Sequence, residues 1–186
     1  MINILFFILQ YLMIIILEGG LGSGKTLMMS RYLRKDYQNG NKIMANYDLF
    51  GIKYDKLNVA NLMHDEDIEN VSIGIDEITV FMDCRTSTSR MNRFLSYFVL
   101  QTRKRNVNLY ATTQDIDMVD YRITRHAHFN IICVDIGHEN YRKYTIIDSR
   151  TPRDPKLKRF IMDISKYFGT YDTDQRIYPP IKNISK

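Results

Sequence analysis

Short apolar runs along the chain predict strands that are buried on both faces. Three such runs are Met13–Leu17, Val71–Ile75 and Asn108–Thr113, and the shorter Lys42–Asn46 predicts a further strand. Stretches with helical spacing separate most of these runs. This alternation indicates an α/β fold whose mostly parallel sheet is flanked by helices.

Apolar residues spaced three and four apart predict the helices. One helix covers Leu27–Tyr37 and ends before Asn39-Gly40, a dipeptide that stops helices. A second covers Met91–Arg103, and a third is expected near Leu157–Tyr167 in the C-terminal part. A weaker helical portion is expected around Asn58–Met63.

The last part of the chain changes in pattern and in charge. Asn130–Val134 and Tyr141–Ile147 read as two strands of a hairpin around Gly137-His138. Residues 150–186 carry nine Lys or Arg residues and four Asp residues, so this tail holds the whole net charge of +5. We expect the basic tail to pack on the core.

No repeat or Pro/Gly-rich linker divides the chain, which at 186 residues suits one globular domain. The expected organisation is an apolar extension over residues 1–11, a core over 12–149 and the basic tail over 150–186.

The cysteines and histidines predict no metal centre. Cys84 and Cys133 lie far apart, which favours a reducing compartment with buried thiols. His126 and His128 would share one strand face, but no carboxylate or cysteine accompanies them at ligand spacing.

The first 17 residues contain an uncharged run, Ile2–Leu17. Its second half must form the strand before a glycine loop, and a strand cannot also be a membrane helix. Residues 1–11 therefore remain open to two interpretations, an additional apolar element of the fold or a membrane anchor.

The most informative motif follows the first strand. Gly19, Gly24, Lys25 and Thr26 satisfy the pattern G-x-x-x-x-G-K-[ST], the Walker A motif. Glycines allow backbone N–H groups to surround a phosphate, and the next helix directs its positive end at the same group. The expected nucleotide contacts come from Gly20, Leu21, Gly22, Ser23, Gly24, Lys25 and Thr26.

A second motif fits the same chemistry. The strand Val71–Ile75 ends in Asp76-Glu77, and in a parallel P-loop sheet this end faces the phosphates. Asp76 would hold Mg²⁺ together with the Thr26 hydroxyl, and Glu77 would activate the attacking water. Gln114, at the tip of the third core strand, can contact the γ-phosphate and that water. ATP and Mg²⁺ are the expected cofactors.

From Arg103 to Gln114 the chain resembles the FtsK–HerA superfamily of DNA-pumping ATPases. That family places an arginine before the strand whose tip carries a glutamine. With Asn46 and Arg85 the match is closer to the viral branch, which includes genome-packaging ATPases and zonula-occludens-toxin-like assembly proteins. The similarity covers roughly residues 12–135.

This resemblance implies a RecA-like P-loop NTPase that assembles as a ring, expected to be a hexamer, in the host cytoplasm or on a virion. It implies that Arg103 completes a neighbour's nucleotide site, alongside Lys25, Glu77 and Gln114 as catalytic residues. It further implies an ATP-driven translocase of double-stranded DNA that packages a viral genome, with a capsid or membrane protein of the virion as a partner. The absence of a transmembrane helix after the core favours this packaging motor.

Basic side chains are the candidates for non-specific contacts with DNA phosphates. Residues 85–105 carry six basic residues and no acid. One stripe of the expected helix holds Arg90, Arg93, Tyr97, Gln101 and Lys104, and a solvated helix face is the alternative. The loop Arg85–Ser89 could line the pore of a ring. Arg122 and Arg125 are candidate phosphate sensors or surface ion-pair partners.

Two other functions remain open. A zonula-occludens-toxin-like assembly ATPase would use residues 1–11 as a membrane anchor. A small P-loop kinase would transfer phosphate to an acceptor other than water, but the Asp76-Glu77 pair and Gln114 argue against it.

Overall fold

A computed structural model describes residues 13–58, 62, 68–82, 85, 90–151 and 155–177, without the side chains of residues 90–92. In this part of the chain, eight strands form one sheet in the order β3-β2-β4-β5-β1-β6-β7-β8. The sheet is parallel from β3 to β6, and β7 and β8 extend it in the antiparallel sense. The α/β prediction with a mostly parallel sheet is confirmed.

The elements agree closely with the predicted ranges in the first 150 residues. The strands of the parallel part are β1 (Ile14–Glu18), β2 (Lys42–Ala45), β3 (Asp55–Lys56), β4 (Val71–Ile75), β5 (Val107–Thr113) and β6 (Phe129–His138). The antiparallel strands are β7 (Tyr141–Asp148) and β8 (Lys156–Asp163), and the helices are α2 (Lys25–Gln38), α3 (Arg90–Gln101) and α4 (Tyr121–Thr124).

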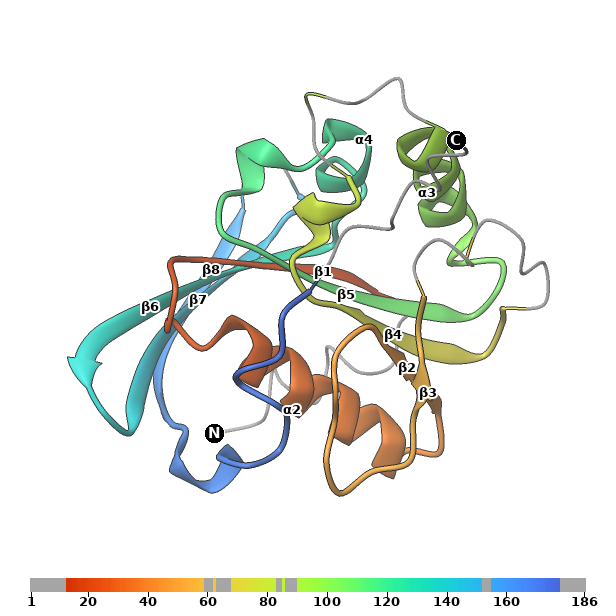
Figure 1. Cartoon of the computed structure of the whole chain (residues 1–186). Coiled ribbons are helices and arrows are strands. Elements are labelled where there is room, and N and C mark those ends of the chain that lie inside the picture. The colour runs from red at the N-terminus through yellow and green to blue at the C-terminus, as the bar shows by residue number, and fades with distance from the viewer. Residues whose placement is uncertain are drawn as a thin grey trace, which may run out of the picture.

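Helices cover both faces of the parallel part, with α2 on one face and α3 and α4 on the other (Figure 1). A hydrophobic core lies on each face of the sheet, and successive side chains of β1 point alternately into one core and the other. Ile14 and Ile16 pack in the core on the α3 side, whereas Ile15 and Leu17 pack in the core on the α2 side. A strand buried on both faces explains why the run is apolar at every position.

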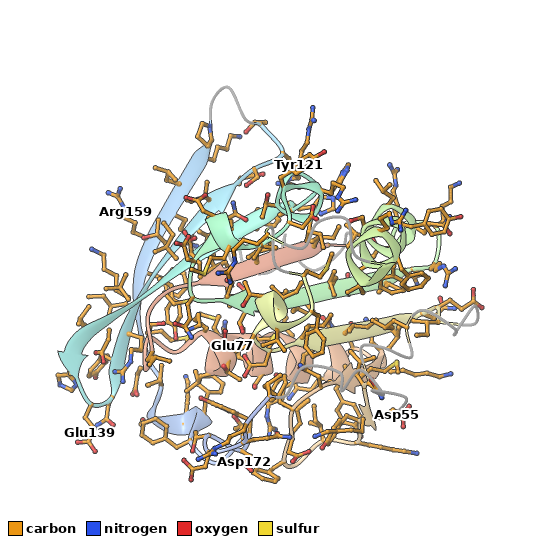
Figure 2. All side chains as sticks on the ribbon, turned by 45° about the horizontal axis from the view of Figure 1, so that its top comes forward. Asp55, Glu77, Tyr121, Glu139, Arg159 and Asp172 are labelled. Atoms are coloured by element: carbon orange, nitrogen blue, oxygen red, sulfur yellow. The ribbon has the colours of Figure 1, made fainter. Side chains whose placement is uncertain are left out.

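The hairpin of β6 and β7 lies where the sequence predicts it. Gly137, which has a φ of 73°, lies within an irregularity in the register between Asp135 and His138, and the chain then turns through Glu139 and Asn140. Figure 2 shows Glu139 at the tip of this hairpin. The hairpin is longer than predicted, because β6 continues through His138.

The helix predicted over Leu157–Tyr167 is wrong. Residues Lys156–Asp163 form β8, which pairs with β7 at every position, and only Ser165–Tyr167 makes a short 3₁₀ turn. Phe160 and Met162 pack toward the α2 side, whereas Leu157 and Ile161 are exposed. The register with β7 therefore decides this segment, and not its apolar spacing.

The placement of the two histidines on one strand face is also wrong. His126 and His128 lie in the turn between α4 and β6. His128 Nδ1 accepts a hydrogen bond of 3.0 Å from the Ile14 backbone N–H, so this ring fixes the start of β1.

Several expectations concern residues outside the described ranges. They are the apolar extension over residues 1–11, most of the weak helix around Asn58–Met63, and the candidate pore loop beyond Arg85. Within the described part, every helix is too short or too polar to cross a membrane.

Candidate active site

Three glycines of the loop between β1 and α2 have positive φ values, Gly22 with a φ of 70° among them, and the other two are also closely packed. Gly19 and Gly24 have φ values of 150° and 85°. A Cβ on Gly19 would lie 2.2 Å from the carbonyl oxygen of Cys133, and one on Gly24 would lie 2.7 Å from the Tyr144 hydroxyl. A Cβ on Gly20 would meet no atom within 4 Å, so no steric contact requires glycine there.

The loop directs its polar groups inward. The buried Lys25 ammonium donates hydrogen bonds to the carbonyl oxygens of Gly19, at 2.8 Å, and Gly20, at 2.9 Å. The Ser23 side chain is 2% exposed, and its Oγ has no hydrogen-bond partner in the described part of the chain. A buried polar atom without a protein partner is what a ligand-binding loop presents.

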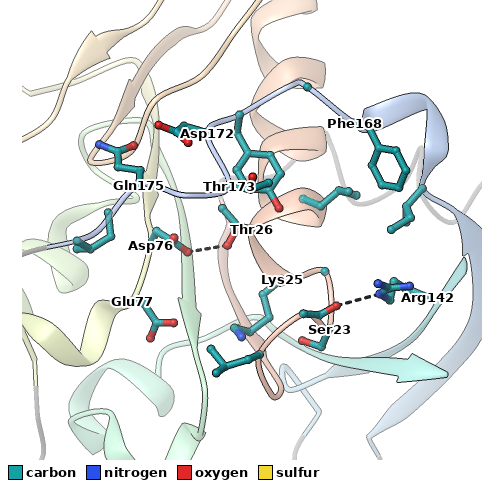
Figure 3. A pocket seen from close by; sticks show the side chains of 18 residues that line it. Ser23, Lys25, Thr26, Asp76, Glu77, Arg142, Phe168, Asp172, Thr173 and Gln175 are labelled. Atoms are coloured by element: carbon teal, nitrogen blue, oxygen red, sulfur yellow. Dashed lines mark hydrogen bonds between the residues drawn. The ribbon is translucent and has the colours of Figure 1, made fainter. Parts of the chain in front are cut away.

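The two Walker motifs meet through direct hydrogen bonds. The Thr26 hydroxyl donates to Asp76 Oδ1 at 2.9 Å (Figure 3), and the Thr112 hydroxyl donates to the same oxygen at 2.6 Å. The hydroxyl and carboxylate oxygens of Thr26 and Asp76 are hard ligands of the kind that Mg²⁺ prefers. These donors fit the predicted metal site.

Side chains from β5 and from just after β2 form hydrogen bonds with the backbone of Asp76 and Glu77. Asn46, just after β2, accepts from the Asp76 N–H at 2.7 Å and donates to the Asp76 carbonyl at 3.0 Å. The Glu77 N–H donates to Thr112 Oγ1 at 2.9 Å. Glu77 has a left-handed backbone, with a φ of 49°. This turn directs its carboxylate toward Lys25 (Figure 3).

These residues line a cavity of about 720 Å³. One wall consists of the glycine loop, the start of α2, and the Asp76-Glu77 pair. The opposite wall consists of Arg142 and of the C-terminal segment, which we define as residues 164–177. The sequence reasoning missed this second wall, because nothing in the local sequence relates it to the glycine loop.

Arg142 connects the hairpin to the glycine loop. Its Nε donates to the Gly22 carbonyl oxygen at 2.9 Å, and its Nη1 donates to the carbonyl oxygens of His138, at 2.5 Å, and Tyr141, at 2.8 Å. The neighbouring strand residue Tyr144 donates to the Gly24 carbonyl at 3.3 Å. Strand β7 in the antiparallel part of the sheet is therefore hydrogen-bonded to the glycine loop and supports it.

Gln114 and Arg103 lie near opposite ends of the central strand β5. Gln114 is exposed directly after β5, at the edge where the glycine loop follows β1, although it does not line the cavity. Arg103 is exposed just before β5. The seven residues of β5 separate the two edges by roughly 20 Å. Arg103 thus lies far from the nucleotide site of its own chain.

The two later arginines do not line the cavity either. Arg122 forms two hydrogen bonds with the buried Asp120, of 2.8 Å from Nε and 2.5 Å from Nη2. These bonds hold the pKa of the Asp120 carboxyl below its usual range. Arg122 therefore acts as an ion-pair partner at the start of α4, and Arg125 is exposed after that helix.

The predicted basic stripe on α3 is exposed where its side chains are described. Arg93, Tyr97 and Lys104 are exposed and Gln101 is half-buried, while Leu95 and Phe98 on the other face are buried.

Cys133 is buried, and burial raises the pKa of its thiol to about 12, so it stays protonated and unreactive.

Comparisons with known proteins place this fold. No family model and no curated protein matches the chain. Among solved structures, the chain resembles the N-terminal domain of zonular occludens toxin from Neisseria meningitidis, at 14% identity and a TM-score of 0.66, over 87% of this chain and 100% of that one.

Two further neighbours broaden the comparison. The genome packaging NTPase B204 from Sulfolobus turreted icosahedral virus 2 matches at 11% identity and a TM-score of 0.58, over 81% of this chain and 96% of that one. A KaiC-like protein from Pyrococcus horikoshii matches at 16% identity and a TM-score of 0.57, over 83% and 87%. The chain therefore has the RecA-like P-loop NTPase fold, and the resemblance to the viral branch is confirmed as a likeness of fold.

Proposed function

We propose that this chain hydrolyses ATP with Mg²⁺ and couples hydrolysis to the movement of double-stranded DNA, in packaging a viral genome. One observation carries the ATPase part. Thr26 and Asp76 share a hydrogen bond of 2.9 Å in the cavity that Lys25 and Glu77 also line. The groups for phosphate, metal and water are thus side by side.

Each residue has a chemical role in this proposal. The glycine loop and Lys25 bind the β- and γ-phosphates. Thr26 and Asp76 would hold Mg²⁺, which supplies positive charge against the negative charge of the phosphates. Glu77, held by its left-handed turn, orients the attacking water and accepts its proton. Gln114 reaches the same edge of the sheet from β5.

The DNA-moving part of the proposal is supported by charge and position. Arg93 on α3 and Lys104 just after this helix offer exposed cations for phosphate contacts. The exposed Arg103 lies at the end of β5 far from the cavity of its own chain. It could therefore reach a nucleotide only in the cavity of a neighbouring subunit. We propose a homo-oligomeric ring, a hexamer, that acts in the host cytoplasm or on the virion.

A second candidate function is assembly of a virion at a membrane. The observation that favours it is the match to the zonular occludens toxin domain, which spans that domain fully at a TM-score of 0.66, against 0.58 for the packaging NTPase. In this version the hydrolysis chemistry is the same, and a membrane protein replaces the capsid as partner. A P-loop kinase is the third and weaker candidate.

The decisive experiment measures ATP turnover of the full chain with and without duplex DNA, at two salt concentrations. We expect DNA to stimulate turnover, and the stimulation to weaken at higher salt, because phosphate contacts release counterions. Lys25→Ala is the control for adventitious ATPase activity. The mass of the nucleotide-bound protein reports the ring.

Other outcomes favour the rivals. ATP turnover that is unchanged by DNA but increases with lipid vesicles would favour the assembly ATPase. Phosphate transfer to an added acceptor, with no release of inorganic phosphate, would overturn hydrolysis in favour of a kinase.

A further inference from the structure

The C-terminal segment supplies half of the cavity, and the phosphate chemistry does not use it. Lys25, Asp76 and Glu77 define where the γ-phosphate end of a nucleotide lies. The nucleoside at the other end must therefore leave the glycine loop on the side away from Glu77. Phe168 lies on that far side, above Arg142 in the view of Figure 3.

We propose that the C-terminal segment is the nucleoside subsite, with the Phe168 ring stacking on the adenine base. This inference rests on the proposed ATP site and adds to it the residues that bind the base. Phe168 lines the cavity and is 54% exposed, so its ring is accessible to a ligand in the cavity. A base laid on this ring would remove apolar surface from water on both partners.

The cavity that Phe168 lines also has apolar walls, which suit a base more than a phosphate. Leu27, Ile164 and Ile177 line the same cavity and offer apolar side chains. Ile164 itself is buried, and its backbone N–H donates to the Asn140 carbonyl at 2.8 Å, next to the hairpin. Phe168 directly follows the 3₁₀ turn Ser165–Tyr167, so its backbone is anchored on that side.

The other side of the segment is fixed to the core by backbone hydrogen bonds. The Phe50 N–H donates to the Thr170 carbonyl at 2.9 Å, and the Asp172 N–H donates to the Asp48 carbonyl at 3.0 Å. A bridge between Leu49 and Tyr171 lies between these two bonds. The wall is therefore held in place by bonds to the core, and a rigid wall lowers the entropy cost of binding.

Helix α2 holds the segment at a third point. Arg31 Nε donates to the Tyr167 hydroxyl at 2.9 Å, and its guanidinium lies 5.8 Å from the centre of the same ring. Because α2 also carries Lys25 and Thr26, one rigid helix sets the distance between the phosphate site and Phe168. A nucleotide bound by both halves would span this fixed distance.

The test compares a ligand that has a base with one that lacks it. Isothermal titration calorimetry of the full chain measures binding of Mg·ATP and of Mg·tripolyphosphate, the latter directly or by competition with ATP. Phe168→Ala should weaken ATP binding by roughly 5- to 100-fold, the usual effect of losing a base–aromatic stack. Tripolyphosphate affinity should change by less than about 2-fold, and Phe168→Tyr should restore ATP affinity.

Tyr121→Ala is the matched control, because Tyr121 is a 65% exposed aromatic residue on α4, on the side of the molecule away from Asp172 (Figure 2). It should leave the affinity for both ligands unchanged. ATP affinity that survives Phe168→Ala, or an equal loss for both ligands in a folded variant, would overturn the subsite. Lys25→Ala should weaken both ligands; if it weakens neither, the phosphate site itself fails.

Discussion

At the residue scale, the groups that hold the two carboxylates come from strands that the motif search did not consider together. The Thr112 hydroxyl donates to Asp76 Oδ1 and accepts from the Glu77 N–H, so one hydroxyl sets both catalytic positions. It belongs to β5, whereas Asp76 and Glu77 follow β4. Neighbouring parallel strands bring the three residues to one edge.

Thr112→Val should therefore lower the ATP turnover number by roughly 10- to 150-fold, because a charge-assisted hydrogen bond contributes on the order of 1.5–3 kcal/mol. Steady-state kinetics with Mg·ATP measures it. Thr113→Val is the matched control, since Thr113 is equally buried but donates to the Asp115 carbonyl instead. Equal effects of both variants would show a general loss of packing in β5 rather than a role at the site.

Glu77→Gln should retain ATP binding and lose hydrolysis by about 10²–10⁴, because an amide cannot accept the proton of the attacking water. Binding is measured by calorimetry and hydrolysis by phosphate release. Normal turnover in this variant would assign water activation to another carboxylate, of which Asp76 is the nearest.

At the element scale, α2 is tied to the sheet by a buried carboxylate near its C-terminal end. Asp36 Oδ2 accepts hydrogen bonds from Ser72 at 2.6 Å, Tyr110 at 2.8 Å and Asn108 at 3.2 Å. Burial nonetheless raises the pKa of Asp36, since loss of hydration outweighs these donors. The network joins α2 to β4 and β5 at the end far from the glycine loop.

This raised pKa predicts the pH dependence of stability. The folded protein keeps the proton of Asp36 at pH values where the unfolded chain, with a pKa of about 3.9, has lost it. The contribution of Asp36 to the free energy of unfolding is thus complete below the unfolded pKa, and declines as pH rises through the folded pKa. Urea unfolding at several pH values should show the advantage of wild type over Asp36→Asn shrinking across that window.

Asp120→Asn provides a control of opposite sign. The Arg122 hydrogen bonds lower the pKa of Asp120, so its contribution is present above the unfolded pKa and is lost as pH falls through the folded pKa. The advantage of wild type over Asp120→Asn should grow with pH. If the advantage of wild type over Asp36→Asn also grew with pH, folding would lower the pKa of Asp36 instead of raising it.

At the scale of the whole molecule, the positions of the cavity and of Arg103 on opposite edges of the sheet bear on assembly. A residue about 20 Å from its own cavity can take part in hydrolysis only if it enters the cavity of a neighbour. An arginine supplied in trans is worth about 10³–10⁵ in rate to related nucleotide hydrolases. The ring proposal makes the isolated subunit a poor enzyme for this reason.

Arg103→Ala should therefore bind ATP normally and hydrolyse it slowly. Mixing it with Glu77→Gln subunits should restore part of the turnover, because some interfaces then join an intact cavity to an intact Arg103. Phosphate release is measured for each variant alone and for the mixture at equal total concentration.

Two inactive variants that still assemble and do not complement each other would leave Arg103 as a surface charge. Arg105 and Arg125 are then tested by the same mixing design. Arg105 is the less available of the two, because its guanidinium lies 5.9 Å from the centre of the Phe98 ring.

Much of the fold and half of the candidate site could be predicted from local patterns in the sequence. The apolar run before Gly19 predicted β1, because a strand buried on both faces has no polar position. Gly24, Lys25 and Thr26 predicted the loop, since the backbone around a phosphate requires these residue types in this order. Asp76-Glu77 was predicted to face the loop, as the parallel sheet places it.

The tertiary structure decided what depends on contacts between distant parts of the chain. Lys156–Asp163 is a strand because β7 offers it an unpaired edge, although its own spacing also suits a helix. Thr112 is a ligand-positioning residue only because β5 lies beside β4. The C-terminal segment forms a wall of the cavity through hydrogen bonds to residues more than a hundred positions earlier. Local sequence encodes conformational preference, whereas such partners are chosen by the packing of the whole sheet.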